Sequence, residues 1–109
     1  MDAKNIFIAC SYYAGRIKWV MIKGNEWNYI GVGDDYNEAK VNKLIERHFS
    51  DLEIYLIIDR HNSFPIQTKI AAQSIRGLLN KNDLTLSNKD FTRMIVFNRI
   101  GVVKYGERL

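Results

Sequence analysis

The chain has 109 residues, of which 47% are hydrophobic and 26% are charged, and its formal net charge at pH 7 is +4. These values are typical of one globular domain spanning 1–109 that forms a hydrophobic core without disulfide or metal staples. The single cysteine, Cys10, excludes an internal disulfide, and no apolar stretch approaches the roughly 18 residues of a membrane span, so we expect a cytoplasmic protein.

The N-terminal third predicts a three-stranded antiparallel meander. The run 5–13 (NIFIACSYY) is apolar on both faces and is typical of a buried strand. Further strands are expected over 16–23 and 26–32. They are joined by Gly24-Asn25, a dipeptide that favours a two-residue hairpin turn.

The middle of the chain first predicts a helix and a central strand. Asp35 has the character of an N-cap, and Glu38 follows three residues later, which together indicate a helix over about 36–49. The run 51–59 (DLEIYLIID) is the most apolar of the chain, so it predicts a strand in the centre of the sheet.

A second helix is expected after this strand. Ser63 is its predicted N-cap and Pro65 lies in its first turn, where the missing N–H costs little. The helix is expected to end near Leu79. Its buried stripe would hold Ile70, Ala71, Ile75 and Leu78.

The last quarter predicts a short strand or a loop over 83–90, a strand over 91–98 and a final strand over 101–106. The order is then β-β-β-α-β-α-β, with or without an extra terminal hairpin. Two strand–helix–strand crossovers predict a single α/β domain with a mixed, mostly antiparallel sheet and two helices.

The Gly31-Val32-Gly33 turn before the first helix allows two interpretations without a metal. A dinucleotide-binding fingerprint would need a third glycine where this chain has Tyr36, and Asp34 and Asp35 would repel a phosphate at the helix start. The favoured interpretation is a sharp turn followed by a capped helix, because glycine permits the turn and acids stabilise the positive helix end.

A third interpretation starts from carboxylates. Asp34, Asp35 and Glu38 surround one helix start, and Asp59 ends the central strand, a placement found in nucleases that hold two Mg²⁺ ions. In placement, the segments FIACS (7–11), YNEAKV (36–41) and IYLIID (54–59) resemble the acid-bearing motifs of the ribonuclease H-like fold. The resemblance covers about residues 5–100 and implies that topology.

The resemblance also implies that the metal-binding acids are mostly absent. The first-strand acid corresponds to Ala9, and the helix glutamate corresponds to Lys40 or, shifted by two, to Glu38. Only Asp59 matches. Because one carboxylate cannot hold two divalent ions, we expect no metal, no cofactor and no catalysis; a degenerate hydrolase centred on Asp59 and His61 is the weaker alternative.

Candidate binding residues fall in three groups. Asp59, Arg60 and His61 share the loop after the central strand, where α/β sites tend to open. The second helix carries a polar face, and the meander carries an aromatic one, which is either part of the core or an outward protein-binding surface. The polar face of the helix holds Lys69, Gln73 and Arg76. The aromatic face of the meander holds Trp19, Trp27 and Tyr29.

We expect a small non-enzymatic binding protein, in concrete form a bacterial or phage immunity protein that inhibits a toxin or enzyme by direct contact. The alternative is a nucleic-acid-binding module, since the second helix and the C-terminal strands carry cations interleaved with aromatic residues. The C-terminal cations are Lys89, Arg93, Arg99, Lys104 and Arg108. His48 is expected to be a hydrogen-bonded core or boundary histidine, and Cys10 an inert core thiol.

Overall fold

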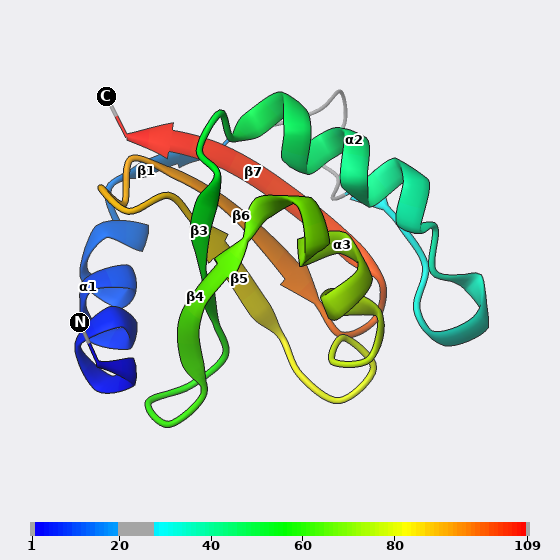
Figure 1. The fold of residues 1–109 in the computed structure, drawn as a ribbon, viewed down its shortest axis with the longest axis horizontal. Helices are drawn as coiled ribbons and strands as arrows, with labels where there is room; N and C mark the ends of the chain where they lie inside the picture. The colour runs from blue at the N-terminus through cyan, green and yellow to red at the C-terminus, as the bar shows by residue number, and fades with distance from the viewer. Residues whose placement is uncertain (1, 20–27, 109) are drawn as a thin grey trace.

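The structure is a computed structural model that describes residues 2–19 and 28–108 (Figure 1). Its elements are, in chain order, α1 (Ala3–Ala14), β1 (Ile17–Trp19), β2 (Asn28–Tyr29), the short 3-10 helix η1 (Gly33–Asp35), α2 (Glu38–His48), β3 (Glu53–Ile57), β4 (Ser63–Gln67), α3 (Thr68–Arg76), β5 (Leu84–Ser87), β6 (Arg93–Asn98) and β7 (Val102–Arg108). The predicted α/β domain is therefore confirmed, with one helix more than expected.

All strand pairs among the described residues are antiparallel, so the prediction of a mixed sheet is wrong. The strand order is β1-β7-β6-β5-β3-β4. β7 also pairs with β2, because β1 lies along the C-terminal half of β7 and β2 along its first residues. The ribonuclease H-like topology is not supported by this order, since it would require parallel pairs across strand–helix–strand crossovers.

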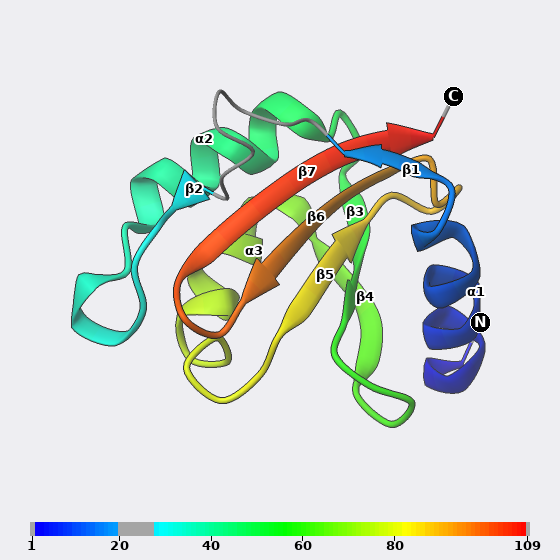
Figure 2. The ribbon, with the colours of Figure 1, turned by 180° about the vertical axis from the view of Figure 1, so that it is seen from behind.

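Helices cover both faces of the sheet. α2 and α3 lie on one face, and α1 packs on the other, near β3 and β4 (Figures 1 and 2). Side chains alternate across each strand, so one apolar strand supplies two cores. In β3, Leu56 belongs to the core under α2 and α3, whereas Tyr55 and Ile57 belong to the core under α1.

The strand predicted over 5–13 is wrong, because these residues belong to helix α1. The carboxylate of Asp2 caps the helix by accepting from the backbone N–H of Asn5 at 2.9 Å. Ile6 and Cys10, four residues apart, are the buried side chains of α1. The run is apolar around most of the helix as well as on both faces of a strand, so its hydrophobic pattern could not distinguish the two.

The helix predicted from Ser63 to Leu79 is wrong in its first turn. Residues 63–67 form strand β4, which among the described strands pairs only with β3 and lies at the edge of the sheet. Proline is tolerated there because an edge strand does not need every N–H. α3 begins after Gln67 and ends at Arg76, and of the predicted stripe Ala71 and Ile75 are buried while Ile70 is exposed.

The helix predicted over 36–49 is confirmed as α2, but its cap differs from the prediction. The side-chain oxygen of Asn37, rather than Asp35, caps the helix by accepting from the N–H of Lys40 at 3.0 Å. Asp35 instead ends η1. The turn before it needs Gly31, which has φ +80° and where a Cβ would collide with the Asp35 carbonyl.

The remaining predicted strands are present with different bounds. The run 51–59 contains β3, which lies between β4 and β5, next to the sheet edge rather than in the centre. The last three predicted strands correspond to β5, β6 and β7. Strands β1 and β2 fall inside the predicted 16–23 and 26–32, but the hairpin at Gly24-Asn25 lies outside the described residues.

Candidate functional site

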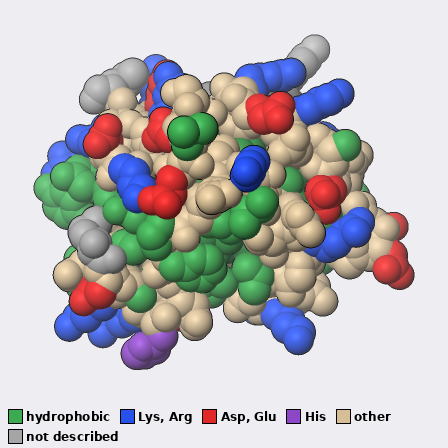
Figure 3. Space-filling model, viewed as in Figure 1, with side chains coloured by type: hydrophobic (Ala, Val, Ile, Leu, Met, Phe, Trp, Pro, Cys, Tyr) green, Lys and Arg blue, Asp and Glu red, His purple; other side chains and the backbone are tan. Residues whose placement is uncertain are grey.

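Exposed apolar side chains gather at the edge of the sheet formed by β4. Seven large hydrophobic side chains are exposed among the described residues, and four lie on α1, β4 or α3. They are Ile8 and Tyr12 of α1, Phe64 of β4 and Ile70 of α3. In Figure 3, hydrophobic side chains extend from α1 across β4 to α3. We call these four residues the β4 edge surface.

The β4 edge surface suits contact through side chains better than strand addition. Phe64 is 41% exposed and Ile70 is 42% exposed, so each keeps a substantial apolar area accessible. Pro65 lies between Phe64 and Ile66 in the edge strand and lacks a backbone N–H. A proline in an edge strand discourages pairing with another chain, so a partner would contact the protruding side chains.

The predicted cluster Asp59, Arg60 and His61 lies in the turn between β3 and β4, at one end of the β4 edge surface. The carboxylate of Asp59 accepts the backbone N–H groups of His61 and Asn62, both at 2.8 Å, and the side-chain amide of Asn62. The hydrogen bond from the Asn62 side chain is the main cause that lowers the Asp59 pKa. Asp59 therefore holds the turn in shape, while Arg60 and His61 are exposed.

The predicted polar face of the second helix is present on α3. Lys69, Gln73 and Arg76 are all exposed there, and Lys69 is the neighbour of Ile70 in the chain. The guanidinium carbon of Arg76 lies 5.8 Å from the ring centroid of Tyr36. These residues and the β3–β4 turn therefore place polar and charged groups next to the β4 edge surface.

Two of the three predicted aromatic residues, Trp19 and Tyr29, lie at the opposite edge of the sheet, on β1 and β2. Trp19 is partly buried and packs against the core under α1, and the Lys104 ammonium lies 4.6 Å from its ring centroid. Tyr29 is 57% exposed. Trp27 lies outside the described residues. The structure therefore does not bring Trp19 and Tyr29 together with the other six predicted site residues.

Several of the basic side chains that were expected to contact nucleic acid form contacts within the protein instead. Three of them form ion pairs: Lys89 with Glu53, Arg93 with Glu107, and Arg99 with Asp83. Arg108 donates to the carbonyl of Asp90 at 3.0 Å, and its guanidinium lies 4.3 Å from the ring centroid of Tyr13. These contacts hold loops and strand ends, so they leave less charge available for phosphate groups.

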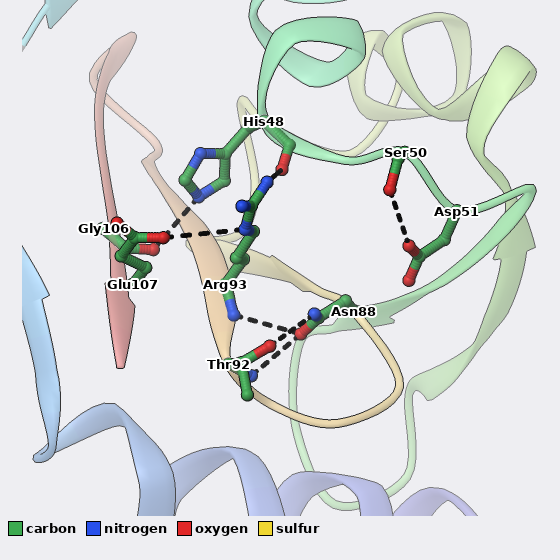
Figure 4. A network of polar contacts seen from close by, with 8 residues as sticks. All are labelled: His48, Ser50, Asp51, Asn88, Thr92, Arg93, Gly106 and Glu107. Carbon is green, nitrogen blue, oxygen red and sulfur yellow. Dashed lines mark hydrogen bonds and ion pairs between the residues drawn. The ribbon is translucent and has the colours of Figure 1, made fainter. Parts of the chain in front are cut away.

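His48 belongs to a polar network that ties the end of α2 to the sheet (Figure 4). Its Nε2 lies 3.0 Å from the carbonyl oxygen of Gly106. Arg93 donates to the His48 carbonyl and pairs with Glu107. Burial is the main cause that lowers the His48 pKa. The neutral ring is thus fixed between helix and strand, in the boundary position expected from the sequence.

The described residues contain no group of three or more histidine, cysteine, aspartate or glutamate side chains placed to hold a metal ion. Cys10 is buried in the core under α1, and its burial raises the pKa of the thiol to about 11. A thiol with such a pKa is a poor nucleophile near neutral pH because it remains protonated.

Sequence reasoning missed the β4 edge surface because it assigned its members to the wrong elements. Ile8 and Tyr12 were placed in a buried strand, and Phe64 and Ile70 in a helix whose stripe included Ile70. The signal that could have found α1 is the four-residue spacing of Ile6 and Cys10 behind Asp2, a good N-cap residue.

Comparison with known protein families, with curated proteins and with solved structures finds no match for this chain. Among the described residues, no helix combines the length and apolar character needed to cross a bilayer.

Proposed function

We propose that this protein is a small binding protein that inhibits another protein by direct contact, in the manner of an immunity protein, and that the β4 edge surface is its contact site. The observation that carries the proposal is the gathering at one sheet edge of four of the seven large hydrophobic side chains that are exposed in the described part of the chain. Large exposed apolar patches that are rimmed by polar residues mark sites of interaction with other proteins or with membranes.

The surface has the composition of a protein interface. Phe64 and Ile70 provide an apolar centre. At one side of it, the Arg16 guanidinium donates a hydrogen bond to the Tyr12 hydroxyl at 2.8 Å. Arg60 and Lys69 are exposed on the neighbouring turn and helix. An apolar centre with a charged rim is the usual anatomy of a contact between two proteins, and tyrosine and arginine are frequent in its hot spots.

Burial of the two central side chains would make a measurable contribution to the affinity of such a contact. Complete burial of a large apolar side chain contributes about 1.5–3 kcal/mol. Phe64 and Ile70 each retain about two-fifths of their exposure, so burying both would contribute roughly 1.2–2.4 kcal/mol by the same scale. This equals about a 7- to 50-fold change in the dissociation constant.

Photo-crosslinking in producing cells tests the proposal. A benzophenone amino acid is placed at Phe64, at Ile70 or, as the control, at Ile100, which is 67% exposed in the β6–β7 turn. We expect one and the same protein to be captured at the first two positions and not at the third. The activity of that protein, once purified, should fall to a plateau at a fixed molar ratio of this chain.

Two outcomes would contradict the proposal. Equal capture at all three positions would mean that the β4 edge surface has no special role. Capture of nucleic acid, with binding that weakens steeply as salt rises, would favour the alternative of a nucleic-acid-binding module, because phosphate contacts release counterions.

A further inference from the structure

A second surface lies at the opposite side of the sheet, between α2 and β7. Here a groove of about 260 Å³ is lined by Ile30, Lys40, Lys43, Leu44, Arg47, Val103 and Tyr105. Ile30 and Val103 are buried in the main core, and Leu44 and Tyr105 pack against it. The groove therefore has an apolar floor. We call it the α2 groove.

Three cations form the wall of the α2 groove that is made by the helix. Lys40, Lys43 and Arg47 recur at three- and four-residue spacing, so they share one stripe that spans about 10 Å along the helix axis. The ammonium of Lys40 donates to the Tyr29 carbonyl at 2.8 Å. No hydrogen bond or ion pair of the Lys43 or Arg47 side chain occurs within residues 2–19 and 28–108.

The cations of this stripe differ from those of the C-terminal strands in their contacts with carboxylates. Ion pairs with carboxylates engage Lys89, Arg93 and Arg99, all on or beside the C-terminal strands. Of the residues that the structure describes, no aspartate or glutamate lines the α2 groove. A row of positive charge above an apolar floor is complementary to a ligand with negative charges and an apolar group.

We propose that the α2 groove binds an acidic segment of another polypeptide, with carboxylates facing Lys43 and Arg47 and an apolar side chain on the floor. The floor favours a polypeptide over a nucleic acid, because bases stack on the faces of aromatic rings. Three of the four floor residues are aliphatic, and the ring of the fourth, Tyr105, already lies 5.3 Å from the His48 ring in an edge contact. The short stripe also offers no extended track for a phosphate backbone.

Fluorescence anisotropy with designed peptides tests this site. The probe is a labelled eight-residue peptide of six glutamates, one leucine and one phenylalanine. The comparison peptides replace either the glutamates by glutamine or the two apolar residues by serine. We expect the probe to bind more tightly than both, and its affinity to fall as salt rises because the charges are exposed.

Charge reversal at the groove provides the decisive comparison. An exposed ion pair changes affinity by a factor of about 1.5–5, and reversal adds repulsion, so Lys43→Glu with Arg47→Glu should weaken the probe at least about tenfold. The matched control is Lys4→Glu with Lys81→Glu, at two exposed positions outside the groove. Two reversals lower the formal net charge of +4 by four in both double variants, so both reach zero and differ only in location.

The outcomes separate this site from the β4 edge surface and from nucleic acid. Substitution of Phe64 and Ile70 by serine should leave probe binding unchanged. If both charge-reversed variants weaken binding equally, net charge alone explains the effect and the proposal is overturned. The proposal is also overturned if the probe does not bind to the unmodified protein. A thymidine oligonucleotide that binds more tightly than the probe, and loses affinity in the groove variant alone, would assign the groove to nucleic acid instead.

Discussion

The hydroxyl of Tyr36 provides a sharp test of how α3 is held in place. Tyr36 precedes α2 and is 4% exposed, and its hydroxyl donates to the carbonyl of Ala72 in α3 at 2.6 Å. α3 carries Ile70 and the polar face beside the β4 edge surface, so this bond helps to position the candidate site. Burial raises the pKa of the Tyr36 hydroxyl, which therefore stays protonated and remains a donor.

Tyr36→Phe removes this donor and leaves the ring in the core. The net contribution of a hydrogen bond is about 1 kcal/mol, and the Ala72 carbonyl keeps its intrahelical bond within α3, so we expect a loss of about 1 kcal/mol in the free energy of unfolding. For a domain near 100 residues this lowers Tm by about 4–8 °C. Urea denaturation and thermal unfolding followed by circular dichroism measure both quantities.

Tyr29→Phe is the matched control, because its side chain is 57% exposed. A hydroxyl removed from the surface should change the free energy of unfolding by less than about 0.5 kcal/mol. The reasoning is refuted if both variants unfold at the same urea concentration as the unmodified chain, since the bond to Ala72 would then contribute nothing.

Further substitutions test the turn, the histidine network and the loop. Gly31→Ala should cost more than about 2 kcal/mol, since φ is +80° and the new Cβ meets the Asp35 carbonyl, whereas Gly77→Ala meets nothing within 4 Å and should be neutral or slightly stabilising in the same urea assay. His48 has a lowered pKa in the folded state, so the unfolded chain binds its proton first as pH falls below about 6.5. Stability should therefore rise between about pH 5 and pH 7, and His48→Gln should flatten that rise. Asp59→Ala removes the acceptor of two N–H groups, and faster amide hydrogen exchange at His61 and Asn62 should report the looser turn; unchanged exchange would contradict that role.

The sequence predicted elements correctly where one hydrophobic period dominated. α2 has buried Val41 and Ile45 at helical spacing, and β6 and β7 lie in runs of strand-forming residues. The predictions failed where an apolar run fitted two periods, as in α1, or where a start signal was ambiguous, as at Ser63 and Pro65. A proline fits the first turn of a helix and an edge strand equally well, so only the pairing of β4 with β3 decides between them.

The candidate site was harder to predict than the fold because it depends on which elements are neighbours. Asp59, Arg60 and His61 were placed correctly in a loop. Their position at the end of an apolar surface follows from β4, which the sequence did not reveal. Likewise, the groove beneath Lys43 and Arg47 exists only because β7 passes alongside α2 (Figure 1).

The most direct test of the central claim is the dissociation constant of the captured partner for three versions of the chain. These are the unmodified protein, the double variant Phe64→Ser with Ile70→Ser, and the control Ile100→Ser. We predict that the double variant binds about 7- to 50-fold more weakly, because it loses the apolar area of Phe64 and Ile70 that the partner would bury. The dissociation constant of the control should stay within about twofold of that of the unmodified protein. Equal affinity for all three would show that the partner does not contact the β4 edge surface.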